Sequence, residues 1–311
     1  MTQLPNYHLP ILTGATKVLI PTEVGNIFVA FFVYQNPLQK GDGMLRLDTE
    51  KLNMSHQSKK SLFCISLVVS FFLLFSASST FAARPLTTDD AYTVKEGEIQ
   101  VEAGFDFARQ DNHDKEYFPS LTLTYGLFER MDIGIGSAYL FIDPADGKKV
   151  NGFSDTPLKV KYRVLDQKDW IPSFAVSGTL VIPTASKSKG LGSGKVDFNI
   201  NTIFTWSISK RWQLYTNLGY TFTGENHVND ELNYSIAGQY LLSDKWALVG
   251  EIVGTNNFNG NKRDDPVSGL VGIQYILIAD KLVLDAGVAV GMNKAAPDFR
   301  VTTGFTFFFK P

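Results

Sequence analysis

Apolar and polar residues alternate one by one along most of the chain after residue 98. In the stretch 99–107, Ile, Val, Ala, Phe and Phe take every second position, and Gln, Glu, Gly and Asp lie between them. A period of two places successive side chains on opposite faces of a β-strand. About twelve such segments follow one another to residue 309, each near the ~10 residues that a tilted strand needs to cross a bilayer. The pattern predicts an all-β protein.

The connections between these segments alternate in length. Short joints such as 243–245 and 279–280 alternate with longer polar ones such as 185–195 and 255–265. An up-and-down barrel that spans a membrane has this arrangement, with short periplasmic turns and longer extracellular loops. A soluble Greek-key sandwich gives no reason for it. We therefore expect residues 98–311 to form a transmembrane up-and-down antiparallel β-barrel of about twelve strands.

Aromatic residues mark both ends of the predicted strands. Tyr and Phe residues gather at the strand ends next to the longer loops, and the tryptophans lie near the short joints: Trp170, Trp206, Trp212 and Trp246. Two aromatic belts are typical of membrane interfaces. Phe305, Phe307 and Phe309 alternate near the C-terminus and resemble the assembly signal of outer-membrane barrels, although Lys310 and Pro311 follow them. The outer-membrane assembly machinery is therefore an expected partner.

Composition and charge exclude several other classes of protein. Lys and Arg total 29 and Asp and Glu total 31, which gives a formal net charge of -2. No basic surface for nucleic acid is therefore expected. The single cysteine, Cys64, excludes a disulfide scaffold and a cysteine-based zinc site. We expect no cofactor.

The stretch from Met54 to Ala82 has the features of a secretory signal peptide. Lys59 and Lys60 precede an apolar run over 62–75, and the small residues SASSTFAA lead to a cleavage position before residue 83. The run is shorter than the ~20 apolar residues of a spanning helix, so cleavage is expected rather than anchoring. We expect residues 1–53 to be an unstructured extension upstream of the true start, and residues 83–97 to be an N-terminal periplasmic segment. The mature protein is then expected in the bacterial outer membrane.

Several stretches resemble a known Gram-negative outer-membrane family. They are RPLTTDDAYTVKEGEIQVEAGFDF (84–107), LTYGLFERMDIGIG (123–136), LKVKYRVL (158–165), KGLGSGKVDF (189–198) and LYTNLGYTF (214–222). The family comprises barrel transporters linked to the meta-pathway of phenol degradation, and the resemblance covers essentially all of residues 83–309. It implies an outer-membrane channel or transporter, in some members connected with the catabolism of aromatic compounds. It defines no catalytic residues.

Strand parity places a set of charged side chains on the inner face of the predicted barrel. They are Glu102, Asp106, Asp132, Lys159, Lys161, Arg163, Asp197, Glu251, Asp285 and Arg300. Segments 131–142 and 155–165 are expected to be neighbouring strands. We therefore expect Asp132 and Arg163 to pair near the periplasmic end. Closure of the barrel brings Arg300 to the height of Asp106. These charges either form a constriction that selects solutes, as rings of charge do in other pores, or neutralise one another and stiffen the wall.

The function favoured by the sequence is passage of small molecules, among them aromatic or apolar compounds, through the lumen. A barrel of this size leaves a narrower lumen than the porins of ~16–18 strands. A structural or interaction barrel without transport is the first alternative, and an outer-membrane lipid-modifying enzyme is the second. The loop histidines His113 and His227 have no matched serine, which argues against an enzyme. The Gly-rich stretch 189–195 lacks the spacing and the helix of a phosphate-binding loop. The expected partners are outer-membrane lipid and a small-molecule solute. The sequence predicts neither the oligomeric state nor whether residues 83–97 plug the lumen.

Overall fold

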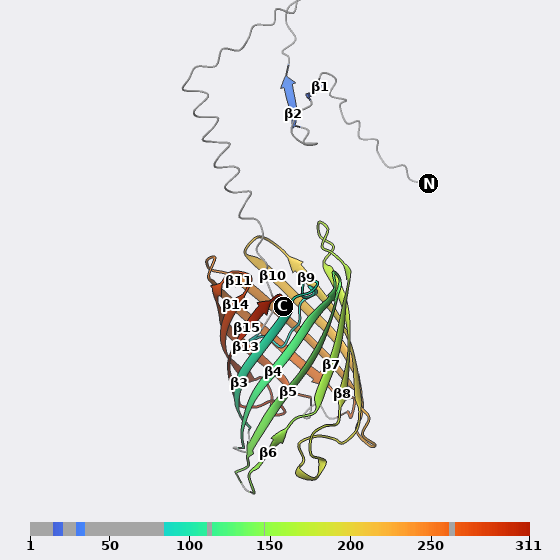
Figure 1. Ribbon diagram of the computed structural model, residues 1–311, viewed down its shortest axis with the longest axis vertical. Coiled ribbons are helices and arrows are strands. Elements are labelled where there is room, and N and C mark those ends of the chain that lie inside the picture. The colour runs from blue at the N-terminus through green and yellow to red at the C-terminus, as the bar shows by residue number, and fades with distance from the viewer. Residues whose placement is uncertain (1–14, 21–28, 35–83, 111–113, 146, 261–264) are drawn as a thin grey trace, which may run out of the picture. The chain divides into compact units, whose positions relative to one another are not determined.

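The computed structural model of the chain describes residues 15–20, 29–34, 84–110, 114–145, 147–260 and 265–311 (Figure 1). The chain divides into two units, Met1–Phe71 and Phe72–Pro311. In the first unit β1 (Ala15–Ile20) and β2 (Val29–Tyr34) pair antiparallel. This pair differs from the unstructured stretch expected for residues 1–53, because both segments are rich in the β-branched and aromatic residues that favour strands. The predicted signal peptide, 54–82, lies outside the described residues.

In the second unit, the described residues from 84 onward form twelve long strands and one short one, β6. The strands are β3 (Ile99–Arg109), β4 (Lys115–Phe128), β5 (Met131–Asp143), β6 (Val150–Phe153), β7 (Thr156–Leu165), β8 (Ser173–Ile182), β9 (Asp197–Ser207), β10 (Trp212–Phe222), β11 (Glu231–Leu241), β12 (Trp246–Asn256), β13 (Val267–Ile278), β14 (Leu282–Gly291) and β15 (Phe299–Phe309). A 3-10 turn, η1 (Lys187–Lys189), lies in the β8–β9 loop. Among the described residues no helix is long and apolar enough to cross a membrane.

These strands close into a barrel (Figure 1). The long strands pair antiparallel with their sequence neighbours, and the last strand, β15, pairs with the first, β3, from Phe299–Arg109 to Phe309–Ile99. Short β6 extends the pairing of β7 along β5 toward the long loops. The predicted all-β, up-and-down antiparallel barrel of about twelve strands is therefore confirmed.

The two ends of the barrel differ in the length of their connections. Turns 129–130, 208–211, 242–245 and 279–281 lie at one end, which we call the short-turn end, and the opposite end is the long-loop end. The β7–β8 connection, 166–172, lies at the same end, and within it Lys168 and Ile171 form an extra bridge that extends the hairpin. At the short-turn end Trp212 stacks near Tyr240 and Trp246 near Tyr275, with ring centroids 4.6 and 4.5 Å apart.

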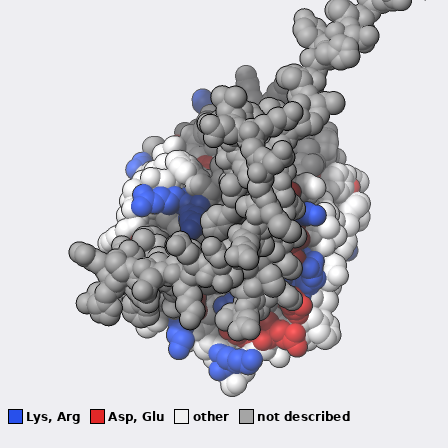
Figure 2. Space-filling model, turned by 90° about the horizontal axis from the view of Figure 1, so that it is seen from above, with Lys and Arg blue, Asp and Glu red and all other residues white. Residues whose placement is uncertain are grey.

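Apolar side chains cover the outside of the barrel and polar side chains line its inside. On β12, Leu248 and Ile252 point outward and are nearly half exposed, whereas Glu251 points inward and is buried. This inverts the pattern of a soluble protein and suits a wall whose outer face meets lipid. Figure 2, viewed along the barrel, shows described Lys, Arg, Asp and Glu side chains at the rim, while uncharged residues make up the outer wall.

Candidate functional site

Residues 84–97 run inside the barrel and contact its inner wall over most of their length. Their hydrogen-bond partners include Asp132 on β5, Thr205 on β9, Asn217 on β10, Glu251 on β12 and Thr302 on β15. We call residues 84–97 the lumen segment. Its position differs from the periplasmic segment expected from the sequence. The physical reason is that its charges and backbone donors find partners on the polar inner wall, which hydrophobic periodicity does not reveal.

Arg84 lies between two acidic side chains of the wall. Its Nη1 lies 3.6 Å from Asp106 Oδ2 and its Nε lies 3.7 Å from Asp285 Oδ1. Its Nη2 donates to Thr302 Oγ1 at 2.6 Å and to the Thr303 carbonyl at 3.1 Å. Both carboxylates are buried. Arg84 therefore balances negative charge that the lumen otherwise leaves in a region of low water content.

Glu251 holds the next part of the lumen segment. The backbone N–H of Thr87 donates to both carboxylate oxygens at 2.9 Å, and that of Thr88 donates to Oε2 at 2.9 Å. The Thr88 hydroxyl donates to Oε2 at 2.8 Å, which is the fourth hydrogen bond that the carboxylate accepts. Glu251 is thus a docking point for two consecutive residues of the segment.

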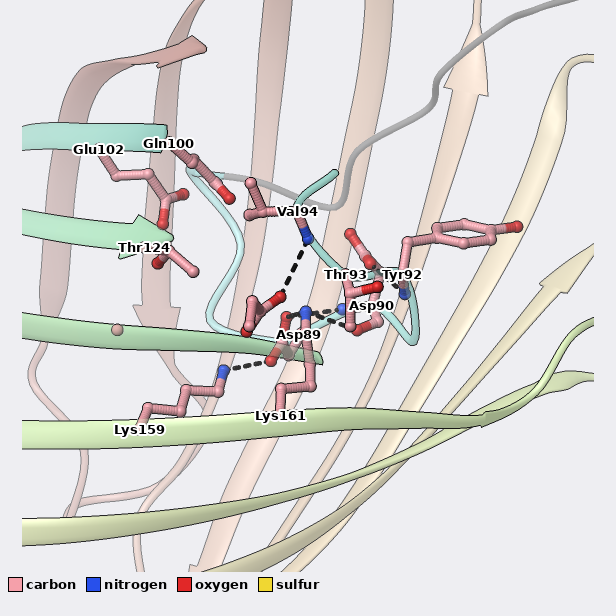
Figure 3. A pocket seen from close by; sticks show the side chains of 12 residues that line it. Asp89, Asp90, Tyr92, Thr93, Val94, Gln100, Glu102, Thr124, Lys159 and Lys161 are labelled. Carbon is pink, nitrogen blue, oxygen red and sulfur yellow. Dashed lines mark hydrogen bonds and ion pairs between the residues drawn. The ribbon is translucent and has the colours of Figure 1, made fainter. Parts of the chain in front are cut away.

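Asp89 is anchored on the opposite side of the lumen, against β7. Its carboxylate pairs with Lys159 and, at 3.2 Å, with Lys161, as Figure 3 shows. Asn217 accepts a hydrogen bond from Asp89 N–H at 2.8 Å and donates one to the Asp89 carbonyl at 2.9 Å. The lumen segment therefore places a positive residue, Arg84, on the acidic wall and a negative one on the basic wall.

The rest of the segment follows the wall to the short-turn end. Ala91 N–H donates to Thr205 Oγ1 at 2.9 Å, and Val94 N–H donates to Asp132 Oδ2 at 3.0 Å. Gly97 N–H donates to the carbonyl of Gly126, beside the start of β3. Ala91 also packs with Ala175 and Ile203 in a small buried apolar cluster.

The ion pairs of Asp89 should persist in mild acid. Burial raises the pKa of Asp89, but Lys159 and Lys161 together have a larger effect in the opposite direction. The pKa of Asp89 therefore falls from its ordinary 3.8 to about 2. A carboxyl group whose pKa is lower in the folded protein than in the unfolded chain stabilises the folded protein fully at pH values above its ordinary pKa. This stabilisation is lost as the pH falls through the pKa of the folded state. We expect the backbone amides beside Asp89, residues 88–91, to keep their protection from hydrogen–deuterium exchange, corrected for intrinsic rates, from pH 8 to about pH 4. Asp89→Asn should lose protection already at pH 7. Loss of protection between pH 6 and 4 in the unaltered protein would contradict the assignment.

Seven of the ten charged residues predicted for the inner face meet the lumen segment directly. They are Glu102, which is hydrogen-bonded to the backbone of Arg84, and Asp106, Asp132, Lys159, Lys161, Glu251 and Asp285. Glu102 lines a small cavity of ≈70 Å³ beside the segment, together with Lys159 and Lys161. Arg300 Nε lies 4.0 Å from Asp106 Oδ1, next to Arg84.

The remaining two predicted residues lie away from the segment. Asp197 accepts a hydrogen bond from Gly224 N–H at the long-loop end. Arg163 pairs with Asp166 at 3.2 Å and donates to the Glu129 carbonyl in the short turns. The predicted pair of Asp132 and Arg163 was wrong, because the β5–β7 register sets Lys161 directly opposite Asp132.

A larger cavity of ≈390 Å³ lies beside Thr87, toward the long-loop end. We call it the vestibule. Carboxamides and hydroxyls from β9 to β13 dominate its inward-facing lining, which includes Asn199, Asn201, Asn217, Asn233, Ser235, Thr255 and Ser268. Neighbouring side chains form a ladder, in which Asn199 and Asn233 both donate to Thr221 Oγ1. The vestibule is therefore uncharged and rich in hydrogen-bonding groups, and sequence parity could have revealed its run of inward Asn and Thr residues.

The sequence of the barrel matches a described family. The family model described as "Putative MetA-pathway of phenol degradation" matches residues 82–309. No curated protein sequence is detectably similar to the chain.

Solved structures share the fold at low sequence identity. An outer membrane channel from Pseudomonas putida F1 is 11% identical with a TM-score of 0.58, and the alignment covers 72% of this chain and 100% of that chain. The NanC porin is 10% identical with a TM-score of 0.49, over 67% of this chain and 98% of that one. The CymD monoaromatic hydrocarbon channel is 9% identical with a TM-score of 0.40, over 70% and 89%.

Proposed function

The chain belongs to the MetA-pathway of phenol degradation family, and we propose that it is an outer-membrane channel whose lumen segment is a movable plug. Small neutral molecules that carry hydrogen-bonding groups, phenolic compounds among them, would pass through the lumen when the plug moves aside. The observation that carries this proposal is the chemistry of the contacts between residues 84–97 and the wall. No reaction is catalysed in this proposal.

Ion pairs and hydrogen bonds, rather than packed apolar side chains, hold most of the lumen segment in place. Small barrels that are closed for structural reasons fill their interior with packed side chains. Here, among the described residues, the buried apolar cluster that includes the segment consists of Ala91, Ala175 and Ile203. Arg84, Thr87, Thr88 and Asp89 are held by ion pairs and hydrogen bonds instead. Water can replace such bonds at a net cost of about 1.5–3 kcal/mol for each bond to a charged group, and because the barrel strands pair with one another, displacement of the segment does not require loss of the barrel.

The vestibule supports the proposed class of solute. Its volume, ≈390 Å³, lies within the ~300–1,000 Å³ range of small-molecule sites. Its carboxamides offer both donors and acceptors, because each amide has a carbonyl oxygen and two N–H groups. Its uncharged lining favours neutral solutes over ions. A hydroxylated aromatic ring meets these conditions, and the family description is consistent with it.

The same proposal assigns the chain's location and its parts. Residues 54–82 are the signal peptide, residues 1–53 precede the true start, and residues 98–311 form the barrel. The long-loop end faces the outside of the cell, as in other outer-membrane barrels. The fold shared with the channel of Pseudomonas putida F1 supports this location.

Conductance in planar bilayers tests the proposed function. The protein is expressed from the full-length gene, purified from outer membranes and checked for the heat-dependent gel shift of folded barrels. We expect brief discrete conductance steps, and we expect catechol, added on the long-loop side, to reduce the current. Asn201→Leu in the vestibule should weaken this reduction, whereas Asn293→Leu in the β14–β15 loop should not.

Two outcomes would contradict the proposal in different ways. Absence of conductance steps both from the unaltered protein and from a variant in which the lumen segment has lost its docking contacts, such as Glu251→Leu, would favour a structural barrel. Steps that catechol leaves unchanged would keep the channel and reject the class of solute.

A further inference from the structure

We propose that the lumen wall beside Arg84 is a guanidinium-binding subsite, which Arg84 occupies as a tethered ligand and which small guanidinium compounds bind when Arg84 is absent from it. The subsite comprises Gly104, Gly304, Asp106, Asp285 and Thr302. The inference goes beyond passage of neutral solutes. Binding to the subsite needs no conducting pore. Only the expected effect of methylguanidinium on the conductance rests on the proposed function.

Glycines shape the wall at this place. Gly104 on β3 and Gly304 on β15 are directly paired across the strands, and both take inward positions where the alternation calls for a side chain. A Cβ built at Gly104 would overlap the Arg84 guanidinium, and one at Gly304 would lie 2.5 Å from Arg84 Nε. Glycine weakens a strand interior and often marks a close approach by another group. The flat backbone of this pair is therefore what allows a planar guanidinium to lie against the wall.

A second glycine pair extends the same recess. Gly272 on β13 and Gly287 on β14 are also direct partners with inward positions. A Cβ at Gly272 would lie 2.7 Å from Pro85 Cγ, and one at Gly287 would lie 3.3 Å from it. Four consecutive strands, β13, β14, β15 and β3, thus carry an inward glycine where residues 84 and 85 rest. The recess is built into the wall and fits the first residues of the lumen segment.

Asp285 identifies the charge that this recess binds. Its side chain is 1% exposed, and within the described residues neither of its oxygens accepts a hydrogen bond. The cation nearest to it is the Arg84 guanidinium, with Nε at 3.7 Å, while Glu102 and Asp106 add negative charge in its surroundings. Arg300 lies against Asp106 instead. A buried carboxylate without hydrogen bonds is costly, so an empty recess would favour a cation with N–H donors.

The remaining contacts favour a guanidinium over a quaternary ammonium ion. Thr302 Oγ1 and the Thr303 carbonyl accept from Nη2 of Arg84, while Asp106 lies at Nη1 and Asp285 at Nε. The acceptors thus surround a flat group with donors in several directions, as a guanidinium has. A quaternary ammonium ion has no N–H donor and cannot satisfy them.

Calorimetric titration with methylguanidinium chloride tests the subsite. The protein is purified in detergent from outer membranes, with each variant checked for the gel shift of a folded barrel. We expect Arg84→Ala to bind methylguanidinium in the millimolar range, and the unaltered protein to bind it at least tenfold more weakly because Arg84 fills the recess. Asp285→Asn in the Arg84→Ala background should abolish binding. Asp244→Asn, which removes an exposed carboxylate in a short turn, should leave it unchanged. If Arg84→Ala folds poorly, Arg84→Met, which keeps an apolar stem, takes its place in the titration and should bind methylguanidinium in the same range.

Specificity separates a subsite from general attraction of cations. Tetramethylammonium chloride at the same concentration should not bind. Equal binding of both cations, or equal binding by the unaltered protein and Arg84→Ala, would overturn the proposal, as would absence of binding by both Arg84 variants. In bilayers methylguanidinium should also lower the current of Arg84→Ala. Calorimetric binding without any conductance would keep the subsite and reject the channel.

Discussion

Cross-linking the lumen segment to the wall is expected to abolish conductance until the cross-link is reduced. The change is Ala91→Cys together with Thr205→Cys. Ala91 N–H lies 2.9 Å from Thr205 Oγ1, which keeps the two Cα atoms within the ~6.8 Å limit for a disulfide. Both residues are fully buried, so the new bond would hold the middle of the segment inside the lumen. Current is measured in planar bilayers before and after addition of dithiothreitol.

The native cysteine content makes this experiment clean. Cys64 is the single cysteine of the chain and falls in the predicted signal peptide, so a processed protein has no competing thiol. Each single-cysteine variant is the control and should conduct as the unaltered protein does under both conditions. Conductance that persists in the oxidised double variant, with the disulfide verified by mass spectrometry, would mean that solutes pass without movement of residues 84–97.

The sequence predicts the barrel well because two constraints act on every strand. A period of two sorts side chains to the two faces, and a slip of one residue would turn Asp106, Glu251 and Asp285 toward lipid. Register is therefore strongly determined by the pattern, and parity alone places these carboxylates inside. Closure then follows from the count of strands, which brings β15 beside β3 and Arg300 beside Asp106.

The partners of the inward charges cannot be predicted in the same way. The pair expected for Asp132 was Arg163, but a two-residue difference in hairpin register gives Lys161 that position. The segment 84–97 has no hydrophobic period, and several of its contacts join residues more than a hundred positions apart, as between Thr87 and Glu251. One signal was present in the sequence: the inward positions of Gly104, Gly272, Gly287 and Gly304 lack side chains, which indicates a close approach by another part of the chain.

Loss of the Glu251 carboxylate is expected to open the channel more than any other single substitution in the lumen. In Glu251→Leu, the backbone N–H groups of Thr87 and Thr88 and the Thr88 hydroxyl lose their acceptor. An unsatisfied buried donor costs about 1–3 kcal/mol. The two buried donors, the Thr88 N–H and the Thr88 hydroxyl, should together shift the balance between the docked and the displaced segment by about 3 kcal/mol, a factor of roughly 100. The open probability of single channels measures this shift.

Two further substitutions separate the role of this carboxylate from a general effect of charge. Glu251→Gln keeps one carbonyl oxygen as an acceptor, so its open probability should lie between those of the unaltered protein and Glu251→Leu. Glu231→Gln removes an inward carboxylate at the long-loop end of β11, where residues 84–97 make no hydrogen bond among those described, and should leave the open probability unchanged. If Glu251→Leu and Glu231→Gln behave alike, the docking of Thr87 and Thr88 does not hold the channel closed. If Glu251→Leu alone opens it, polar contacts with a carboxylate of β12 set the balance, as a plug that must leave and return through water requires.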